Sequence, residues 1–374
     1  MSPVEAFDDL APRLRRWPDV EAHDLVAADA SDRLILAEAD PAGDVVVIGD
    51  RYGGLTLALC AADPARRVRV HQDPLTGERA LAANADRVGI DIAGRVTWHD
   101  LGPSLVEGAS TVLLQLPRGL DALDEIASVV ARHADPSVRL VAGGRVKHMT
   151  LSMNDVLARH FGDVRASRGV QKSRVLHAGA PRADGGSAWP VSQRHDDVGL
   201  TLCAHGAAFA GASLDIGTRF LLAQLHEIPA VAHAIDLGCG TGAIAAAYAL
   251  AHPESRVIAS DRSAAAVASA RGTMRANGVA DRVDVVRDDA LAGQPDASAD
   301  LVLLNPPFHS GSAVTTALAP RLFSDAARVL RPGGELWAVW NSHLRYRPAL
   351  ERLVGPTRQI ARDRTFTVTA SRRR

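Results

Sequence analysis

The tetrapeptide Asn305-Pro306-Pro307-Phe308 combines residue types that could hold a planar amine during a chemical transfer. The amine of a nucleobase or an amide is a poor nucleophile, because its lone pair is delocalised. The Asn305 side-chain oxygen and the Pro306 carbonyl could accept both amine hydrogens, which would aim the lone pair at an electrophile. Proline fixes the backbone that presents this carbonyl, and Phe308 offers a ring on which a base could stack. The motif predicts transfer to an amine nitrogen, although a bare Asn-Pro-Pro string could also be a turn.

A second candidate site is the glycine-rich turn of Gly238, Gly240 and Gly242, which follows an apolar run ending near Asp236. Glycines let the backbone turn tightly and let a ligand approach the amide groups at the start of a helix. Asp261 lies 19 residues after Gly242, at the end of the next predicted strand. A carboxylate there could accept hydrogen bonds from both ribose hydroxyls of a nucleoside cofactor. The pattern therefore predicts a nucleoside-binding site.

The string D-L-G-C-G-T-G at residues 236–242 resembles the first motif of the class I methyltransferases that use S-adenosyl-L-methionine (SAM). This resemblance favours SAM over a dinucleotide and implies that the acidic residue and the glycines of the string hold it. By the same resemblance, Asp289 would contact the adenine amine and Ala290 the edge of the adenine ring. Asp288 and Asp289 could instead form a solvated turn. Together with the Asn-Pro-Pro-Phe motif, the glycine loop is typical of amine N-methylation.

Three further segments resemble the bacterial ribosomal RNA guanine-N2 methyltransferases: residues 205–222, 305–311 and 341–353. That family contains small-subunit and large-subunit enzymes, which share a duplicated architecture with a degenerate N-terminal half. The resemblance covers nearly the whole chain and is slightly closer to the large-subunit branch. It implies methylation of the exocyclic N2 amine of a specific guanine in ribosomal RNA. The guanine would be held by Asn305, Pro306, Pro307 and Phe308, and SAM by Gly238, Gly240, Asp261 and Asp289.

The two halves of the chain have similar sequence patterns. Residues 45–59 (VVVIGDRYGGLTLAL) match residues 234–250 (AIDLGCGTGAIAAAYAL), and each stretch is followed by a short apolar run and an Ala-rich helical segment. Short apolar runs that alternate with helical segments predict a parallel sheet with helices on both faces. We therefore predict an α/β protein of two tandem Rossmann-like class I SAM-dependent methyltransferase domains, the N-terminal one degenerate. A rhythm shared by any two Rossmann-like folds is the alternative to duplication.

The first copy is predicted to have lost the cofactor site. At a constant offset of 188 residues, Ile48 stands where the second copy has its acidic residue, and Asp50 and Tyr52 stand where it has loop glycines. A carboxylate and a bulky ring in those places would obstruct a cofactor. Asp73, which matches Asp261 at this offset, proves little by itself.

The composition of the chain predicts three segments. Residues 1–180 would form the degenerate domain, which we expect to dock RNA, and residues 198–374 the catalytic domain. Residues 181–197 are rich in Gly, Pro, Ser and Asp and lack periodicity, which predicts a linker.

The net charge of the chain is close to zero, with 42 Lys and Arg residues against 43 Asp and Glu residues. This balance excludes a uniformly basic nucleic-acid binder. It conceals two basic segments, residues 139–177 with eight Lys or Arg and residues 345–374 with nine Arg, each containing only two acidic residues. Both are candidates for contacts with RNA phosphates, although an Arg-rich solvated surface is the alternative. The expected partner is ribosomal RNA or a ribosomal subunit.

The remaining signals concern the compartment and two reactive side chains. No apolar run approaches the ~18 residues that a membrane span needs, and the N-terminus lacks the pattern of a signal peptide. Cys60, Cys203 and Cys239 form no CxxC pair, so we expect neither a disulfide nor a metal site in a cytoplasmic monomer. Cys239 is expected to pack rather than to react. His309 could relay a proton, contact RNA or shape the site.

Two other functions stay open at the level of the sequence. The enzyme could methylate another planar amine, either adenine N6 in RNA or DNA or a glutamine amide in a protein. The chain could also be a noncatalytic RNA-binding assembly factor. The intact glycine loop, Asp261 and Asn305 argue against that second alternative.

Overall fold

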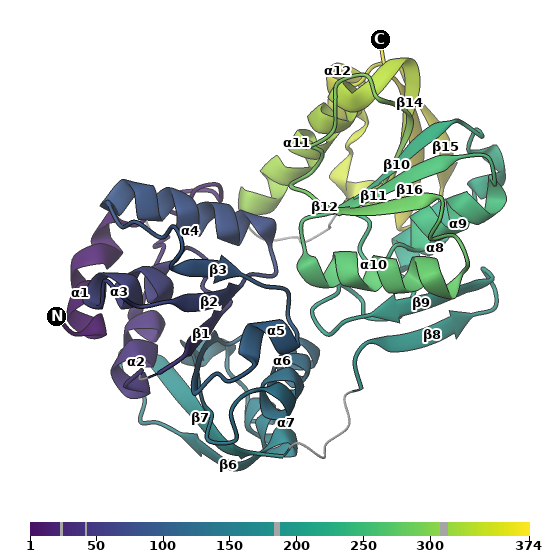
Figure 1. The fold of residues 1–374 in the computed structure, drawn as a ribbon. Helices are drawn as coiled ribbons and strands as arrows, with labels where there is room; N and C mark the ends of the chain where they lie inside the picture. Colours follow the sequence, from purple (N-terminus) through teal and green to yellow (C-terminus); the bar gives the residue numbers. More distant parts are fainter. Residues whose placement is uncertain (23–24, 42, 183–187, 307–312) are drawn as a thin grey trace. The chain divides into compact units, whose positions relative to one another are not determined.

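The computed structural model describes residues 1–374 except 23–24, 42, 183–187 and 307–312. The chain forms two compact units, Met1–Trp189 (unit 1) and Pro190–Arg374 (unit 2), whose elements are labelled in Figure 1. The predicted linker differs from this division, because part of it is regular structure. The strand β7 extends to Pro181, and Val191–His195 is the strand β8, which pairs with β9 (Leu200–Ala204). The predicted segments 1–180, 181–197 and 198–374 stay a prediction.

Unit 1 contains a seven-stranded sheet of order β3-β2-β1-β4-β5-β7-β6. Its strands are β1 (Val45–Ile48), β2 (Val68–His71), β3 (Val96–Trp98), β4 (Thr111–Gln115), β5 (Arg139–Arg145), β6 (Phe161–Ala166) and β7 (Ser173–Pro181). Its helices are α1 (Pro3–Leu10), α2 (Ala30–Ala39), α3 (Gly54–Ala62), α4 (Leu75–Val88), α5 (Pro103–Val106), α6 (Leu120–His133) and α7 (Ser152–His160), with short 3-10 turns η1 (Ala11–Arg13) and η2 (Val146–His148). The strands β1 to β5 are parallel, and β7 is antiparallel to both of its neighbours.

Unit 2 repeats this order in a second seven-stranded sheet, β12-β11-β10-β13-β14-β16-β15, beside the two-stranded sheet β8-β9. The strands of the large sheet are β10 (His233–Leu237), β11 (Arg256–Asp261), β12 (Val283–Arg287), β13 (Ala299–Leu304), β14 (Leu330–Asn341), β15 (Thr357–Arg362) and β16 (Phe366–Arg372). The helices are α8 (Ile216–Leu222), α9 (Ala243–Ala251), α10 (Ala264–Ala276), α11 (Ala313–Val329) and α12 (Arg347–Leu353), with 3-10 turns η3 (Leu225–Glu227) and η4 (Ser342–Leu344). The predicted fold class, two Rossmann-like α/β domains in tandem, is confirmed.

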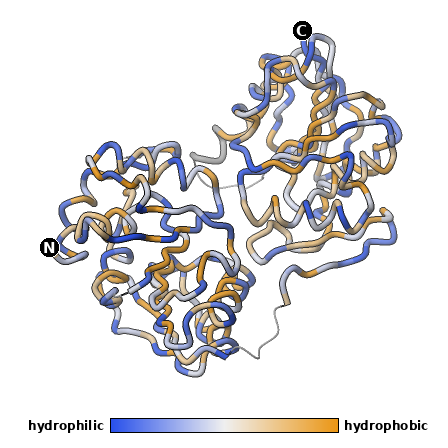
Figure 2. The backbone as a smooth tube through the Cα atoms, viewed as in Figure 1, coloured by the Kyte–Doolittle hydropathy of each residue, from blue (hydrophilic) through white to orange (hydrophobic). Residues whose placement is uncertain are grey.

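The apolar runs of the sequence form central strands that are buried on both faces. In β1, Val45 and Val47 point into one core of unit 1, whereas Val46 and Ile48 point into the other. Side chains of a strand alternate between the two faces, so a strand covered by helices on both sides must be apolar throughout. These central strands are coloured as hydrophobic in Figure 2. The short apolar runs that predicted a doubly wound sheet are therefore strands whose side chains are buried on both faces of the sheet.

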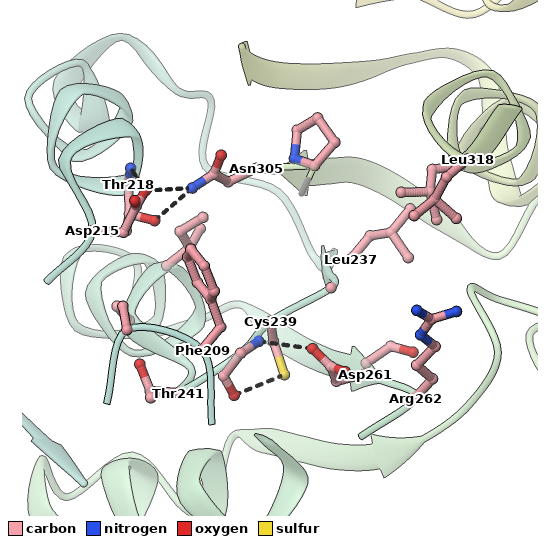
Figure 3. A pocket seen from close by; sticks show the side chains of 18 of the residues that line it. Phe209, Asp215, Thr218, Leu237, Cys239, Thr241, Asp261, Arg262, Asn305 and Leu318 are labelled. Atoms are coloured by element: carbon pink, nitrogen blue, oxygen red, sulfur yellow. Dashed lines mark hydrogen bonds between the residues drawn. The ribbon is translucent and has the colours of Figure 1, made fainter. Parts of the chain in front are cut away.

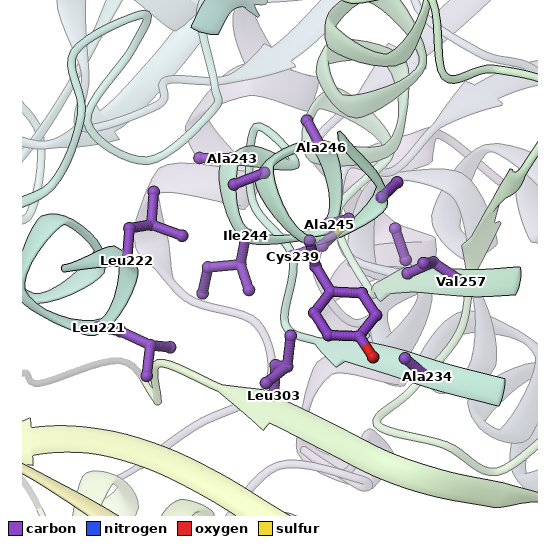
Figure 4. Packing of buried hydrophobic residues seen from close by; sticks show 14 of the residues in the cluster. Leu221, Leu222, Ala234, Cys239, Ala243, Ile244, Ala245, Ala246, Val257 and Leu303 are labelled. Atoms are coloured by element: carbon purple, nitrogen blue, oxygen red, sulfur yellow. The ribbon is translucent and has the colours of Figure 1, made fainter. Parts of the chain in front are cut away.

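The helix α9 shows how the second copy packs beside its glycine loop. Ala243, Ile244 and Ala246 of this helix belong to one core cluster with Leu303 of β13, as seen in Figure 4. Small alanine side chains let the helix lie close to the sheet. Cys239 belongs to the same cluster and is buried.

The register of the sheets corrects the predicted offset between the two copies. Val45 pairs with Val68 in unit 1, and Ala234 pairs with Val257 in unit 2. Val45 therefore matches Ala234, at an offset of 189 residues, and the predicted offset of 188 is one residue short. The cause is the tandem Gly53-Gly54 pair, since either glycine can be aligned with a single glycine in the second copy.

Backbone angles identify which glycine is equivalent. Gly53 is the N-cap of α3 with a φ of 87°, and Gly242 is the N-cap of α9 with a φ of 81°. Gly49 and Gly238 likewise have φ values of 75° and 71°. A positive φ favours glycine, so unit 1 keeps two of the three loop glycines, and Arg51 stands where unit 2 has the third.

Candidate active site

The candidate active site lies where neighbouring strands of unit 2 end. The strands β11, β10 and β13 are adjacent and parallel, so their carboxyl ends meet at one edge of the sheet, where ligands bind in folds of this type. A cavity of about 530 Å³ opens there and is drawn in Figure 3. It brings together these residues predicted from the sequence: Gly238, Gly240, Asp261, Asp289, Ala290, Asn305 and Pro306.

The three glycines of the loop have different roles. Gly238 and Gly240 have positive φ values of 71° and 54°, and a Cβ added to either would meet no heavy atom within 4 Å. Both therefore present bare backbone to open space. A Cβ on Gly242 would lie 2.6 Å from Met274 Cε and 3.0 Å from Ala270 Cβ. Gly242 thus allows α9 to pack against α10, and it does not line the cavity.

Asp236 lies beneath the loop and does not line the cavity. Its Oδ2 accepts a hydrogen bond from the backbone N–H of Ala245 at 2.9 Å, which caps the first turn of α9. Burial raises the pKa of Asp236 to about 7, with a smaller contribution in the same direction from the charge of Asp261, while the bond from Ala245 lowers it. Within the described part of the chain, Oδ1 has no hydrogen-bond partner.

Asp261 ends β11 with its carboxylate at the cavity. Oδ2 accepts a bond from the N–H of Gly240 at 3.0 Å, and Oδ1 accepts one from the N–H of Ser263 at 2.9 Å. These two bonds fix the carboxylate beside the glycine loop. A carboxylate is a hydrogen-bond acceptor, so hydroxyl groups of a ligand would meet an acceptor beside the loop.

The Asp-Asp-Ala turn after β12 is buried and organised, which differs from the solvated-turn alternative. Asp288 accepts bonds from two backbone N–H groups of its own turn, both at 2.8 Å. Asp289 is only 4% exposed and forms an ion pair with Arg321 Nη2 at 2.8 Å. Ala290 has a φ of 61°, and its carbonyl accepts a bond from the hydroxyl of Ser260 at 2.9 Å.

Asn305 follows β13 with its side-chain amide held in one orientation. Nδ2 donates to Asp215 Oδ2 at 2.8 Å and to Thr218 Oγ1 at 2.9 Å, as the dashed lines in Figure 3 show. Oδ1 is buried and accepts no hydrogen bond from the described residues. The amide of this cavity-lining residue therefore has one orientation, with its oxygen left to accept a hydrogen bond.

The rest of the predicted catalytic motif is only partly described. Pro306 is buried and lines the cavity, whereas Pro307, Phe308 and His309 lie outside the described residues. Burial raises the pKa of the Cys239 thiol well above its usual range, and the charges of nearby carboxylates act in the same direction. A thiol of this kind is a poor nucleophile, in agreement with a packing role.

Sequence reasoning missed three residues of the site. Asp215 and Thr218 lie about 90 positions before Asn305, and Arg321 lies in a helix after the motif. Asp215 could have been suspected as a helix N-cap, because it precedes α8 and its side chain accepts from the N–H of Thr218. Nothing local marks Arg321 as the partner of Asp289.

The described residues offer no evident place for a metal ion or a membrane span. Over the ranges that the structure describes, no group of three or more His, Cys, Asp and Glu side chains could hold a metal ion. No helix in those ranges has both the length and the apolar character needed to cross a membrane. Cys60, Cys203 and Cys239 are buried free thiols.

Comparisons with known proteins agree with the geometry. A family described as "Methyltransferase small domain" matches residues 199–370, and one described as "RLMG N-terminal domain" matches residues 5–182. A protein of Streptomyces coelicolor named ribosomal RNA large subunit methyltransferase G is 39% identical over 95% of this chain and 96% of its own. A protein of the same name from Pseudomonas aeruginosa is 37% identical over 95% of this chain and 96% of its own.

One solved structure extends the similarity to the whole fold. It is a 16S rRNA N2 methyltransferase of T. thermophilus in complex with AdoMet and guanosine. Its TM-score is 0.74, with 20% sequence identity and coverage of 100% of both chains. At this identity the likeness concerns the fold alone.

Proposed function

Because this chain belongs to the ribosomal RNA large subunit methyltransferase G family, we propose that unit 2 transfers a methyl group from SAM to the N2 amine of one guanine in large-subunit ribosomal RNA. The observation that carries the proposal is the presence of two features in one cavity. An exposed glycine backbone lies beside the carboxylate of Asp261, and Asn305, whose amide is held in one orientation, lines the same cavity. The first feature suits a nucleoside cofactor and the second suits an amine.

The residues around the glycine loop fit SAM. Gly238 and Gly240 leave open space where the cofactor would approach the backbone, and Asp236 supports the loop from below. Asp261 would accept bonds from the ribose hydroxyls, while Asp289 and Ala290 would meet the adenine. When bound, SAM supplies a methyl group on a positively charged sulfur, which an amine nitrogen can attack.

The residues after β13 would hold the guanine. Asn305 Oδ1 and the Pro306 carbonyl would each accept one hydrogen of the N2 amine, so that the nitrogen lone pair is no longer held in the plane of the base. This contribution is positioning and electrostatic stabilisation, and it needs no strong base. Pro307 and Phe308 would complete the base site. The guanine must be unpaired or flipped out of its stack to reach Asn305.

Unit 1 would dock the RNA. The loops that follow its neighbouring strands β1, β4 and β5 carry a basic rim, which consists of Arg51, Arg118, Arg145, Lys147 and His148. Burial, followed by the positive charges of the other four residues, lowers the pKa of His148. A cluster of cations at the mouth of a lost cofactor site suits the phosphates of an RNA backbone.

The remaining parts of the proposal concern the state of the protein. We infer that it acts in the cytoplasm as a monomer. The glycine loop, Asp261 and Asn305 all belong to unit 2, so the residues proposed for transfer are present in a single chain. Light scattering on the purified protein tests this, and a dimer at the concentration of the transfer assay contradicts it.

The function is tested by mapping modified nucleosides by mass in ribosomal RNA from cells that lack the protein. We expect the loss of one N2-methylguanosine from large-subunit RNA, restored by the wild-type gene but not by Asn305→Ala. Loss of an N6-methyladenosine would instead favour the adenine alternative. Unchanged ribosomal RNA would contradict the proposal and favour a protein substrate or an assembly factor.

The docking role of unit 1 is tested by the salt dependence of RNA binding. Removing two phosphate contacts with Arg118→Ala and Lys147→Ala should lower the slope of log affinity against log salt by about one to two. Arg132→Ala is a matched control, because this exposed arginine ends α6 and therefore lies at the opposite edge of the sheet. An unchanged slope in the double variant would contradict docking at the rim.

A further inference from the structure

The side-chain amide of Asn305 has no hydrogen left to donate to a substrate. An asparagine amide nitrogen carries two hydrogens, and here one points to Asp215 Oδ2 and the other to Thr218 Oγ1. Turning the amide over would bring Oδ1 against the acceptor oxygen of Asp215, which is unfavourable. The oxygen of Asn305 is therefore the only polar atom of the amide without a hydrogen-bond partner among the described residues, and it can only accept.

We propose that Asp215 and Thr218 are positioning residues for methyl transfer, which hold Asn305 so that it can only accept hydrogen bonds from the substrate amine. The negative charge of Asp215 also polarises the amide and makes Oδ1 a stronger acceptor as positive charge develops on the amine nitrogen. This inference rests on the proposed function. It predicts that the cavity selects a hydrogen-bond donor at this position and rejects a carbonyl oxygen.

The start of α8 is built to reach Asn305 closely. Asp215 is the N-cap of this helix, and its Oδ2 accepts bonds both from the N–H of Thr218 at 2.9 Å and from Asn305. A Cβ on Gly217 would lie 3.2 Å from Asp215 Oδ2 and 3.4 Å from Asn305 Oδ1. A larger residue at 217 would push the helix away. The helix cap therefore also holds the amide, and the backbone leaves little room for another arrangement.

Unit 1 contains a bond that can be compared with the one between Asn305 and Asp215. The register places Leu114 beside Ile48 and Leu304 beside Leu237, so Gln115 is equivalent to Asn305. Gln115 Nε2 donates to Asp32 Oδ1, and Asp32 belongs to α2. An amide–carboxylate bond is therefore present in both units, and the one in unit 2 adjoins the cavity with the open glycine loop. Removing the bond in unit 1 measures what such a bond contributes to folding alone.

Kinetics separate positioning from a purely structural role. At saturating SAM, we expect Asp215→Ala and Thr218→Val to lower kcat on large-subunit RNA by about tenfold or more, as the loss of one oriented hydrogen bond implies. The Kd for SAM, measured by calorimetry, should change by less than about threefold. Thr218→Ser keeps the hydroxyl and should restore kcat. Asp215→Asn keeps an acceptor without the charge and should fall between wild type and Asp215→Ala.

Two kinetic outcomes would overturn the inference. In one, Asp215→Ala and Thr218→Val keep the wild-type kcat. In the other, kcat falls only in parallel with SAM affinity, which would make Asp215 a cofactor ligand. Gln115→Ala is the matched control, and a thermal unfolding curve of each variant shows how much of any loss reflects instability.

A measurement without RNA keeps the inference distinct from the proposed function. In protein labelled with 15N-asparagine, the side-chain signal of Asn305 is identified by its absence in Asn305→Ala. Its hydrogens should exchange slowly with water in the wild type and rapidly in Asp215→Ala and Thr218→Val. Equal exchange rates would overturn the inference. A wild-type protein that shows slow exchange but methylates no large-subunit RNA would contradict the proposed function only.

Discussion

The two glycine loops, residues 47–53 of unit 1 and 236–242 of unit 2, share a fold but place a carboxylate differently. In unit 2 Asp236 Oδ2 accepts from the N–H of Ala245 at 2.9 Å, and in unit 1 Asp50 Oδ2 accepts from the N–H of Thr56 at 2.7 Å. At the offset of 189 residues these two amides are equivalent. The first turn of the helix after the loop is capped in both units. The capping carboxylate comes from the strand β10 in unit 2 and from the loop itself in unit 1.

The origin of the capping carboxylate changes the surroundings of the loop. Asp236 acts from beneath the loop, so the faces of Gly238 and Gly240 stay open. In unit 1 the loop itself carries the buried Asp50, and Gln72, at the position of Asp261, donates to the Asp50 carbonyl. Unit 1 therefore keeps the helix cap, and the contacts of Asp50 and Gln72 agree with the prediction that it has lost the cofactor site.

The largest effect is expected from removing the amide of Asn305, which lines the cavity of unit 2. Asn305→Ala should lower kcat by about 10²–10³-fold, the range found when one oriented transition-state partner is lost, with SAM affinity largely intact. Gln115→Ala, its equivalent in unit 1, should leave transfer close to wild type. Single-turnover transfer and calorimetry measure the two quantities. A collapse of SAM affinity in Asn305→Ala would show that its role has been misassigned.

The next effect concerns the glycine that only unit 2 retains. Gly240→Arg introduces the residue that unit 1 carries as Arg51, at a φ of 54° and in open space that the cofactor would need. We expect the Kd for SAM to rise by about 100-fold, which corresponds to about 2.7 kcal/mol. The reverse change, Arg51→Gly, should create no second SAM site, because Asp50 and Gln72 remain. Calorimetry gives the number of SAM molecules bound per chain. Two bound SAM molecules in Arg51→Gly would contradict the expected difference between the two loops.

Removing the capping carboxylate should weaken SAM binding in unit 2, where it is Asp236, but not in unit 1, where it is Asp50. Asp50→Ala should lower the free energy of unfolding of unit 1 by about 1–2 kcal/mol, as the loss of a helix cap does, without changing the Kd for SAM. Asp236→Ala should destabilise unit 2 and also weaken SAM binding, because the loop loses its support. Calorimetric melting with and without SAM distinguishes them. Weaker SAM binding in Asp50→Ala would be incompatible with a loop that has no ligand.

The last expected effect is a pH dependence of stability. Burial is the main cause that raises the pKa of Asp236 and of Asp32 from 3.8 to about 7. The folded protein then holds protons that the unfolded chain releases, so stability should fall as the pH rises from about 4 to about 7 and level off above. Asp236→Asn and Asp32→Asn should each flatten this dependence, measured by melting temperature across that range. A stability that rises over the same range in the wild type would contradict the assignment.

The fold and the family could be predicted from the sequence because their signals are local. Four-residue apolar runs mark central strands, and the glycine loop, Asp261 and Asn305 stand at strand ends, which the topology brings together. Relatives at 34–39% identity confirm the predicted family and its large-subunit branch. The register of the two copies was wrong by one residue, since only backbone angles distinguish Gly53 from Gly54.

Other parts of the site depend on contacts that no local pattern reports. The bond between Asp215 and Asn305 joins residues 90 positions apart, and the ion pair of Asp289 joins it to Arg321. The sequence also did not reveal that Asp236 acts from below the loop rather than in the cavity. Each of these features follows from packing between elements, so it needs the folded chain.

The N-cap positions of α3 and α9 are both glycine, Gly53 and Gly242, for a reason that does not involve a ligand. A Cβ on Gly53 would lie 2.9 Å from Leu81 Cγ, just as one on Gly242 would meet Met274. Both glycines allow two helices to pack closely. This packing is needed whether or not a ligand binds. A glycine that is present in both copies can thus be retained for helix packing and need not indicate a ligand site. For inferring lost chemistry across such duplicated proteins, the replaced glycine at Arg51 is more informative than the two that survived.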